Sequence, residues 1–372
     1  MSPKTLDFQS LLRPGILRTR PYSPGKPIEE VQRELGLDSV VKLASNENPE
    51  GPLPAVLAAI ADAAREINRY PDAACFRLTA RLADHLGVDP AGLIFGNGSN
   101  EVIDMLIRAL VSPGENVVYS EHSFIVYALT TQVHFECGVA VPLGADDRHD
   151  LPAMAAAVDE RTKLVIVCNP NNPTGTYNTA AELRAFLAAV PDHVIVALDE
   201  AYYEYVTADD YPRTVPMLAA HPNLVILRTF SKIHSLAGLR VGYGVGHPDL
   251  VGELHKTREP FNVNMLSQAA AIACLDHWDE VAGRRDRNRA ELDRMVAGLE
   301  ALGLQTVPSQ TNFVLVRGDV NAGELATRLL QMGVIVRPMH AFGLGDGAMR
   351  ISIGLPDENT RCLAALEEIL DR

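Results

Sequence analysis

The chain has 372 residues, of which 47% are apolar, and it carries a formal net charge of −14 at pH 7 with a pI near 5.2. This size predicts one large core and one smaller core within a compact subunit. Strong negative charge without a basic cluster argues against nucleic acid and anionic membrane surfaces. We therefore expect neither of them as a partner.

The N-terminal residues MSPKTLDFQSLLRPG lack the apolar run of a signal peptide. No segment approaches the roughly 20 apolar residues that cross a bilayer, so we expect a cytoplasmic protein. The cysteines are odd in number and far apart, which argues against a disulfide framework and against a CxxC metal site. We expect reduced core thiols and no bound metal. The cysteines are Cys75, Cys137, Cys168, Cys274 and Cys362.

Residues 1–50 are predicted to form an N-terminal arm and part of a small domain. Pro27 should open a short helix with acidic residues in its first turn, and Gly36 should end it. The ASNENPEG segment that follows, residues 44–51, has the composition of a turn.

Residues 51–275 are predicted to form a large α/β domain. Helical patterns alternate there with short runs that are apolar at successive positions, which suits strands buried on both faces of a mainly parallel sheet. Thr179 and Glu182 match a capping box, and Pro191 should stop the helix that they begin. The predicted strands are LIF (93–95), NVVYS (116–120), KLVIVC (163–168), HVIVALD (193–199) and LVILRT (224–229).

Residues 276–372 are predicted to form a smaller α+β domain, because the order of elements changes to βαββα after a long helix. That helix should cover 280–302 and end at Gly303. The later elements are a strand in 311–318, a helix near 322–332, strands in 334–339 and 348–354, and a last helix from 357.

Lys232 is one of six lysines and follows the apolar run 223–227, where a strand is expected to end in a loop. A solvated surface lysine is the usual alternative. However, the segments on both sides are apolar or glycine-rich, which does not suit an exposed helix face. Burial beside a cation would lower the pKa of the amine and leave it nucleophilic near neutral pH.

Asp199 ends another predicted strand, where an isolated carboxylate would be costly unless it is paired or caps a helix. Tyr202 lies three residues further on, and Asn172 lies in the NPNNPTG turn at 169–175. The carboxylate can pair with a pyridine nitrogen, while the phenol and the amide can bond a ring oxygen. With Lys232 as a Schiff-base amine, these groups suit pyridoxal phosphate.

A phosphate site is expected where the LIF strand leads into a helix, since free N–H groups at a helix N-terminus bind anions. We expect Ser99 to cap that helix. A glycine turn before a capped helix would by itself explain this segment, and the lysine loop adds further donors. The candidate phosphate ligands are Gly98, Ser99, Asn100, Thr229, Ser231 and Arg240.

Several motifs in this order resemble fold-type I, class II pyridoxal-phosphate aminotransferases. They are SNENP (45–49), NRYP (68–71), NPNNPTG (169–175), DEAY (199–202), and FSK (230–232) followed by LAGLRVGY (236–243). The arm at 20–36, together with 42–52, is similar to the histidinol-phosphate aminotransferase family in particular. The resemblance runs along essentially the whole chain. It implies a mainly parallel seven-stranded sheet covered by helices, with a smaller α+β domain.

The resemblance also implies roles for individual residues. Lys232 would form the Schiff base and Asp199 would pair with the pyridine nitrogen, while Tyr202 and Asn172 would bond the phenolic oxygen. Phe124 would stack on the ring, where many relatives have tyrosine. Phosphate would be held by the six candidate ligands already named. Tyr70 would reach the phosphate in a neighbouring subunit, so a homodimer is expected.

Substrate residues implied by the resemblance are Tyr22, Asn172, Arg337 and Arg350. The planar guanidinium of arginine suits bidentate binding of an oxyanion. The two arginines and Tyr22 would clasp the phosphate of L-histidinol phosphate, and Arg350 would take the carboxylate of glutamate. The implied reaction is transamination with 2-oxoglutarate, which yields imidazole-acetol phosphate and glutamate in histidine biosynthesis.

Three alternatives remain open at this stage. An aromatic amino-acid aminotransferase shares nearly every motif, and the SFIVY segment (123–127) would suit an aromatic substrate. A phosphothreonine-type decarboxylase on the same scaffold would release carbon dioxide. A non-catalytic sensor would only bind the cofactor. His234, beside the lysine, either modifies the edge of the site or is a packed loop histidine.

Overall fold

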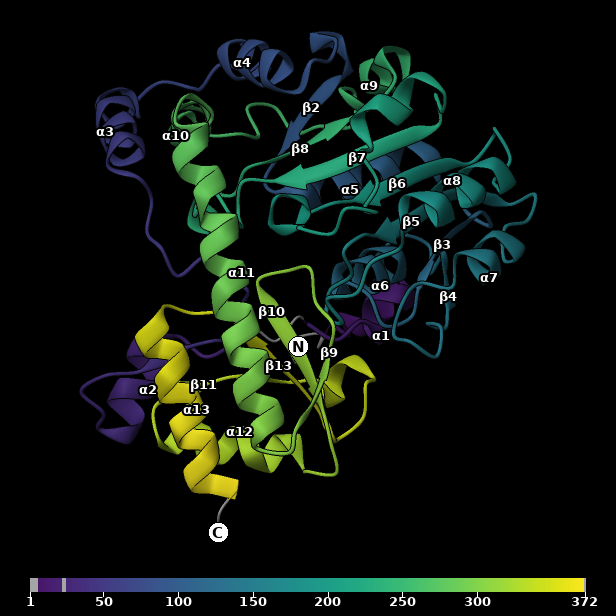
Figure 1. The fold of residues 1–372 in the computed structure, drawn as a ribbon. Coiled ribbons are helices and arrows are strands. Elements are labelled where there is room, and N and C mark those ends of the chain that lie inside the picture. The colour runs from purple at the N-terminus through teal and green to yellow at the C-terminus, as the bar shows by residue number, and fades with distance from the viewer. Residues whose placement is uncertain (1–5, 22–24, 371–372) are drawn as a thin grey trace, which may run out of the picture.

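The computed structural model describes residues 6–21 and 25–370 of the chain. Two apolar cores organise it (Figure 1). Helix α11 (Trp278–Ala301) runs from one core to the other: its Val281 lies in the large core, whereas Leu292 and Met295 lie in the small one. A boundary near residue 275 therefore falls at the start of a helix that both cores share.

In the described part of the chain, the large core surrounds a seven-stranded sheet with the order β2-β8-β7-β6-β5-β3-β4. Only β8 runs antiparallel to its neighbours, so the prediction of a mainly parallel sheet is confirmed. The strands are β2 (Leu93–Gly96), β3 (Asn116–Ser120), β4 (Gly138–Val141), β5 (Thr162–Cys168), β6 (Ile195–Asp199), β7 (Leu224–Thr229) and β8 (Gly242–Val245).

Two of these strands, β4 and β8, were not predicted. β4 lies at the sheet edge with partly exposed residues, so it lacks the run of buried apolar side chains that marks the others. β8 contains two glycines, which are more typical of a loop than of a strand. Gly242 is required there, because a Cβ would lie 2.3 Å from the backbone nitrogen of Ser99.

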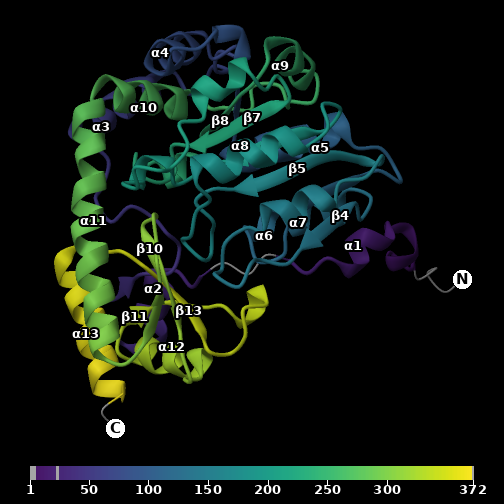
Figure 2. The same cartoon turned by 45° about the vertical axis from the view of Figure 1, so that its right-hand side comes forward.

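Helices cover both faces of this sheet (Figures 1 and 2). The alternation of side chains in β5 explains why: Val165 and Val167 point into one apolar cluster, while Leu164 and Ile166 point into another. The surrounding helices are α3 (Pro54–Ala63), α4 (Phe76–Leu86), α5 (Ser99–Leu110), α6 (Ile125–Val133), α7 (Leu151–Ala156), α8 (Ala180–Ala189), α9 (Pro248–Leu254) and α10 (Met265–Asp276).

The small core packs α11 against an antiparallel sheet with the order β12-β13-β10-β9. Its further elements are β9 (Gln305–Val307), β10 (Phe313–Arg317), α12 (Ala322–Gln331), β11 (Val334–Ile335), β12 (Arg337–Pro338), β13 (Ala348–Ser352) and α13 (Pro356–Leu370). The predicted βαββα order is incomplete, because β9 precedes it. The predicted strand at 334–339 is two strands, of which β11 leaves the sheet to pair with β1 (Val41–Lys42).

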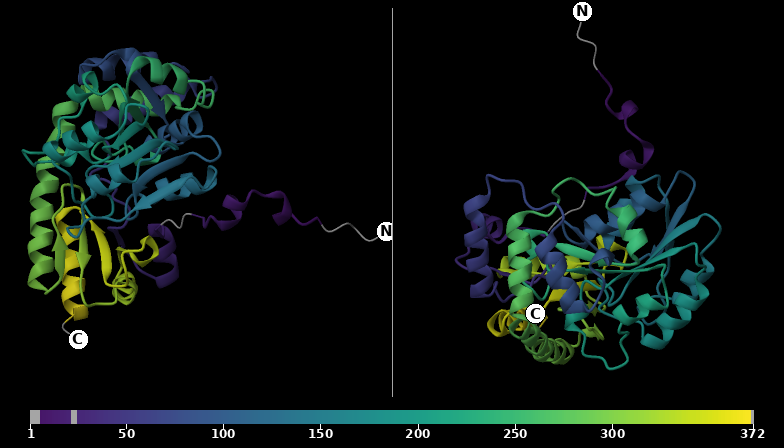
Figure 3. Two further views of the ribbon diagram at one scale, coloured as in Figure 1. Left: turned by 90° about the vertical axis from the view of Figure 1, so that its right-hand side faces the viewer. Right: turned by 90° about the horizontal axis from the view of Figure 1, so that it is seen from above.

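This pairing of β1 with β11 brings the segment after the arm into the small domain. As predicted, α2 (Ile28–Leu35) follows Pro27 and ends at Gly36, which has a left-handed φ of 67°. Helix α1 (Pro14–Arg18) lies against α6 (Figure 2). The N-terminal segment that carries it extends away from the body (Figure 3).

Helix starts bear out one predicted cap and correct another. Thr179 and Glu182 form the predicted capping box of α8. Ser99, however, does not cap α5: the helix begins at Ser99 itself, and the residue before it, Gly98, has a φ of 75°. The turn needs a left-handed residue at the capping position, which only glycine adopts readily.

All five cysteines are buried and unpaired. Among residues 6–21 and 25–370, no helix is long and apolar enough to cross a membrane. The same ranges contain no group of three or more histidine, cysteine or acidic side chains that could hold a metal ion.

Candidate active site

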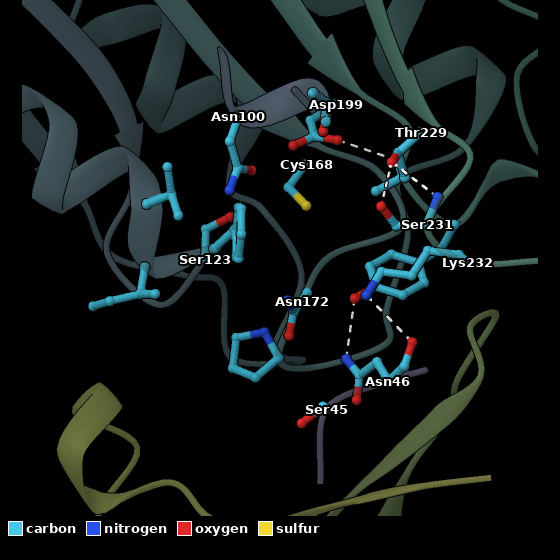
Figure 4. Close-up of a pocket in the computed structure, with 18 of the residues that line it drawn as sticks. Ser45, Asn46, Asn100, Ser123, Cys168, Asn172, Asp199, Thr229, Ser231 and Lys232 are labelled. Carbon is cyan, nitrogen blue, oxygen red and sulfur yellow. Dashed lines mark hydrogen bonds between the residues drawn. The ribbon is translucent and has the colours of Figure 1, made fainter. Parts of the chain in front are cut away.

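A cavity of about 490 Å³ opens between the carboxyl ends of the parallel strands and the small domain (Figure 4). The loops after β5, β6 and β7 contribute to it, as do the start of α5 and the segment after β1. Twelve of the predicted site residues line it. The large domain contributes Gly98, Ser99, Asn100, Phe124, Asn172, Asp199, Tyr202, Thr229, Ser231, Lys232 and Arg240, and the small domain contributes Arg350.

Lys232 lies in the loop after β7, and its Nζ donates a hydrogen bond to the backbone oxygen of Asn46 at 3.2 Å. Burial and the nearby guanidinium of Arg350 lower the pKa of Lys232 from 10.5 to about 8. The amine is therefore far more often neutral near physiological pH than a surface lysine would be.

Asp199 ends β6 with 1% of its surface exposed. Its Oδ2 accepts a hydrogen bond from the hydroxyl of Tyr127 at 2.6 Å, and its Oδ1 accepts one from the N–H of Ala201 at 3.1 Å. Burial raises the pKa of Asp199 above its ordinary value, and the bond from Tyr127 opposes that rise. The sequence predicted a partner for this carboxylate but did not identify Tyr127.

Asn46 is a second residue that sequence reasoning missed as a site residue. Its Nδ2 donates to the hydroxyl of Tyr202 at 3.0 Å, and its Oδ1 accepts from Ser352 at 2.9 Å. It therefore connects the tyrosine, the lysine and the small domain. The sequence signal was its place in the SNENP motif. The structure explains why an asparagine stands there: the residue has a left-handed φ of 53°, which asparagine tolerates better than most residues.

Asn172 lies in the turn after β5, whose peptide bonds to Pro170 and Pro173 are both cis. Its Oδ1 accepts a hydrogen bond from Nη1 of Arg350 at 2.5 Å. Nη2 of Arg350 donates to the backbone oxygen of Ala44 at 2.8 Å. The buried guanidinium is thus anchored at the cavity from two directions.

Another part of the cavity wall is an arrangement of groups that can bind an anion. Helix α5 begins there, so its first backbone N–H groups and the positive end of its dipole are available. Arg240 reaches Oγ of Ser231 at 3.4 Å, and Thr229 bonds the same Oγ at 3.0 Å. A Cβ on Gly98 would lie 2.7 Å from Nη2 of Arg240, so the guanidinium occupies space that only glycine leaves.

Phe124 lines the cavity from the residue that precedes α6. The ring of Tyr127, one helical turn later, meets it edge to face with centroids 5.7 Å apart and an interplanar angle of 88°. Phe124 is therefore held by packing against a buried side chain.

Arg337 does not line the cavity but lies next to residues that do. It is directly opposite Arg350 in the register of β12 and β13. Its guanidinium lies 5.1 Å from the ring centroid of Phe342, a lining residue of the cavity. The predicted placement of the two arginines on consecutive strands is confirmed.

Tyr70 lies away from the cavity, with 81% of its surface exposed and its ring stacked on Phe261 at 4.6 Å. Tyr22 lies outside the described residues. His234 packs between Phe230 and Trp278, with ring centroids 4.6 Å and 5.8 Å away, and burial lowers its pKa to about 3. Of its two interpretations, this packing favours the loop histidine.

The donor set fits pyridoxal phosphate at each functional end of that molecule. The anion-binding groups suit its phosphate, the carboxylate of Asp199 suits a protonated ring nitrogen, and the amine of Lys232 suits its carbonyl carbon. Figure 4 shows Asp199, Thr229, Ser231 and Lys232 around one space.

Comparison with known proteins gives concordant results. The model of the family described as aminotransferase class I and II matches residues 38–366. A histidinol-phosphate aminotransferase 2 of Pseudomonas fluorescens is 48% identical over 98% of this chain and 99% of its own length. A histidinol-phosphate aminotransferase of Brevibacillus brevis is 48% identical over 95% of this chain and 97% of its own.

The fold is also shared with a solved structure. The crystal structure of histidinol-phosphate aminotransferase from Sinorhizobium meliloti in complex with pyridoxal 5′-phosphate superposes with a TM-score of 0.87. It is 31% identical, and the match covers 97% of this chain and 98% of that one.

Proposed function

The chain belongs to the aminotransferase class I and II family, and on this premise we propose that it is a histidinol-phosphate aminotransferase. It transfers the amino group of L-histidinol phosphate to 2-oxoglutarate, giving imidazole-acetol phosphate and glutamate. One observation carries this function: Lys232, with a pKa of about 8, faces the same cavity as the buried carboxylate of Asp199 and the buried cation of Arg350.

Pyridoxal phosphate is the proposed cofactor, and when bound it withdraws electrons from the α-carbon of an attached amine. Lys232 would bind it covalently through its amine, and Asp199 would accept a hydrogen bond from the N–H of its pyridine ring. Tyr202 and Asn172 bond its phenolic oxygen, and Phe124 covers the ring face. The phosphate ligands are Gly98, Ser99, Asn100, Thr229, Ser231 and Arg240.

Lys232 also acts as the general base and acid. Its neutral amine would accept the proton from the substrate α-carbon, and the resulting ammonium would act as the acid that returns this proton. The pKa of about 8 supports this role, because it keeps both protonation states accessible near neutral pH. The hydrogen bond to Asn46 limits the positions that the amine adopts.

Arg350 and Arg337 are the proposed oxyanion ligands for the substrates. Arg350 takes the carboxylate of glutamate, and both arginines bind the phosphate of histidinol phosphate with Tyr22. Asn172 is the remaining proposed substrate ligand. The facing positions of the arginines on β13 and β12 support the shared phosphate role. The greater burial of Arg350 supports its use in both half-reactions.

The proposed enzyme is a cytoplasmic homodimer in which Tyr70 reaches the cofactor phosphate of the partner subunit. Its support is the exposure of large apolar side chains near Tyr70, with Ile67 68% and Phe76 73% exposed. Such a group of exposed side chains is typical of an interface. The buried, unpaired cysteines support a reducing compartment.

An absorbance titration of the purified holoenzyme tests the reaction and the substrate together. Lysine-bound cofactor absorbs visible light, and this absorbance should fall when histidinol phosphate is added and return with 2-oxoglutarate. A response to aromatic amino acids but not to histidinol phosphate would instead identify an aromatic aminotransferase. Release of carbon dioxide would identify a decarboxylase.

A further inference from the structure

Tyr127 is a fully buried tyrosine that the proposed reaction does not use. It lies in α6 with 0% of its surface exposed, and its hydroxyl donates to Oδ2 of Asp199 at 2.6 Å. The other carboxylate oxygen, Oδ1, is held at 3.1 Å by the N–H of Ala201. Two hydrogen-bond donors, one on each oxygen, thus fix the orientation of this buried carboxylate.

The same tyrosine packs against Phe124, which lines the cavity. Their ring centroids are 5.7 Å apart at 88°, and on its other side Tyr127 meets Tyr119 at 6.4 Å. One side chain therefore contacts both the carboxylate proposed for the ring nitrogen and the aromatic group proposed for the ring face.

The hydroxyl of Tyr127 is suited to remain a donor. Burial and the negative charge of Asp199 raise the pKa of Tyr127 well above 10, so it keeps its proton throughout the working range of a neutral-pH enzyme. A donor of this kind favours the ionised form of the carboxylate that accepts from it. Burial alone would favour the neutral acid.

We propose that Tyr127 is a positioning residue that holds Asp199 in place for the pyridine nitrogen and braces Phe124 for the face of the same ring. This role rests on the proposed function, because it requires a cofactor ring between the two side chains. With Tyr127 in place, the proton between Asp199 and the pyridine nitrogen stays on the nitrogen. Without its hydroxyl, the proton moves onto Asp199.

The substitution Tyr127→Phe removes the hydroxyl and keeps the ring that packs on Phe124. Its matched control is Tyr119→Phe, which makes the same change in the adjoining buried tyrosine, whose hydroxyl does not bond Asp199. Both variants are reconstituted with cofactor labelled with ¹⁵N in the ring. The ¹⁵N chemical shift reports whether that nitrogen carries a proton.

In Tyr127→Phe the ¹⁵N signal should move toward that of an unprotonated pyridine, and kcat should fall roughly 10- to 100-fold, the worth of one hydrogen bond to a charged group. The acid limb of the pH–rate profile should move to higher pH, since Asp199 loses a bond that favours its ionised form. Tyr119→Phe should match the native enzyme in all three measurements.

A protonated ring nitrogen and an unshifted acid limb in Tyr127→Phe would overturn the positioning role, even if the melting temperature fell. The native enzyme is measured first. Absence of lysine-bound cofactor there would overturn the proposed function and this role together. Native transamination combined with an unchanged signal in Tyr127→Phe would overturn the role alone.

Discussion

Nη1 of Arg350 lies 2.5 Å from Oδ1 of Asn172, and this hydrogen bond joins the small domain to the turn after β5. One partner is a proposed substrate ligand and the other is a proposed ligand of both cofactor and substrate. The cavity is therefore lined by residues of both domains. A substitution in one domain should affect the position of the site residues that the other domain contributes. Five experiments test the residues proposed to serve this cavity.

Lys232→Ala should abolish turnover, because no other described lysine lines the cavity to replace the amine. Steady-state transamination is the measurement, with Lys256→Ala as the control. Lys256 is 70% exposed and pairs with Glu253, so its loss should leave the rate near native. Robust turnover by Lys232→Ala would rule out the proposed mechanism.

Apo-protein carrying Lys232→Met should be more stable than native apo-protein at pH 7. The folded-state pKa of Lys232 is lowered from 10.5 to about 8, so at pH 7 the native fold holds a disfavoured cation. The unfolded chain binds more protons between pH 8 and 10.5, so native stability rises across that window. Thermal melts should show the difference shrinking from pH 7 to pH 10. A constant difference would contradict the depressed pKa.

Arg337→Ala should impair histidinol phosphate far more than glutamate, by roughly 10- to 100-fold in kcat/KM, the worth of one charge-assisted hydrogen bond. The two half-reactions are followed separately by single-turnover absorbance. Arg328→Ala changes an exposed arginine on α12 and serves as the control. Equal losses with both substrates would refute a phosphate-specific role.

Gly98→Ala should weaken cofactor binding specifically. The new Cβ would lie 2.7 Å from Nη2 of Arg240, at a φ of 75°. Gly87→Ala is the matched control, since its φ is 68° but its Cβ would meet nothing within 4 Å. Both variants should lose about 1 kcal/mol of stability from backbone strain. Only Gly98→Ala should raise the cofactor Kd, and equal Kd values in the two variants would argue against the phosphate site.

Mixing Tyr70→Ala with Lys232→Ala subunits tests whether Tyr70 acts across a dimer. Tyr70→Ala alone should bind cofactor weakly, and Lys232→Ala alone should be inactive. A mixed dimer would contain one site that combines native Lys232 with native Tyr70 from the other chain. Activity at limiting cofactor should therefore rise on mixing. If mixed dimers form without that gain, Tyr70 does not act on the partner's site.

Elements and cavity-lining residues that are recognisable from their neighbours in the sequence could be predicted. The five predicted strands of the large sheet are runs of mostly buried apolar residues. Asp199 is the last residue of β6, and Lys232 lies in the loop after β7. The edge strand β4 and the glycine-containing strand β8 were not predicted, because their formation depends on pairing with neighbouring strands. β8 is shaped by its close approach to the start of α5, which no local pattern reveals.

Site partners that come from distant segments were harder to predict. Tyr127 and Asp199 are separated by 72 residues, and Asn46 and Tyr202 by 156. Nothing near either residue of a pair identifies the other, because tertiary packing brings them together. The mistaken cap at Ser99 has a different cause: serine is a favoured capping residue, but the turn needed a glycine there instead.

Helix α11 contributes Val281 to one core and Leu292 to the other. An α-helix rises about 1.5 Å and turns about 100° per residue. Inserting one residue between these positions would swing the small core around the helix axis and carry Arg350 off the cavity. The length of α11 thus fixes where the proposed substrate arginines, Arg337 and Arg350, lie relative to the large domain.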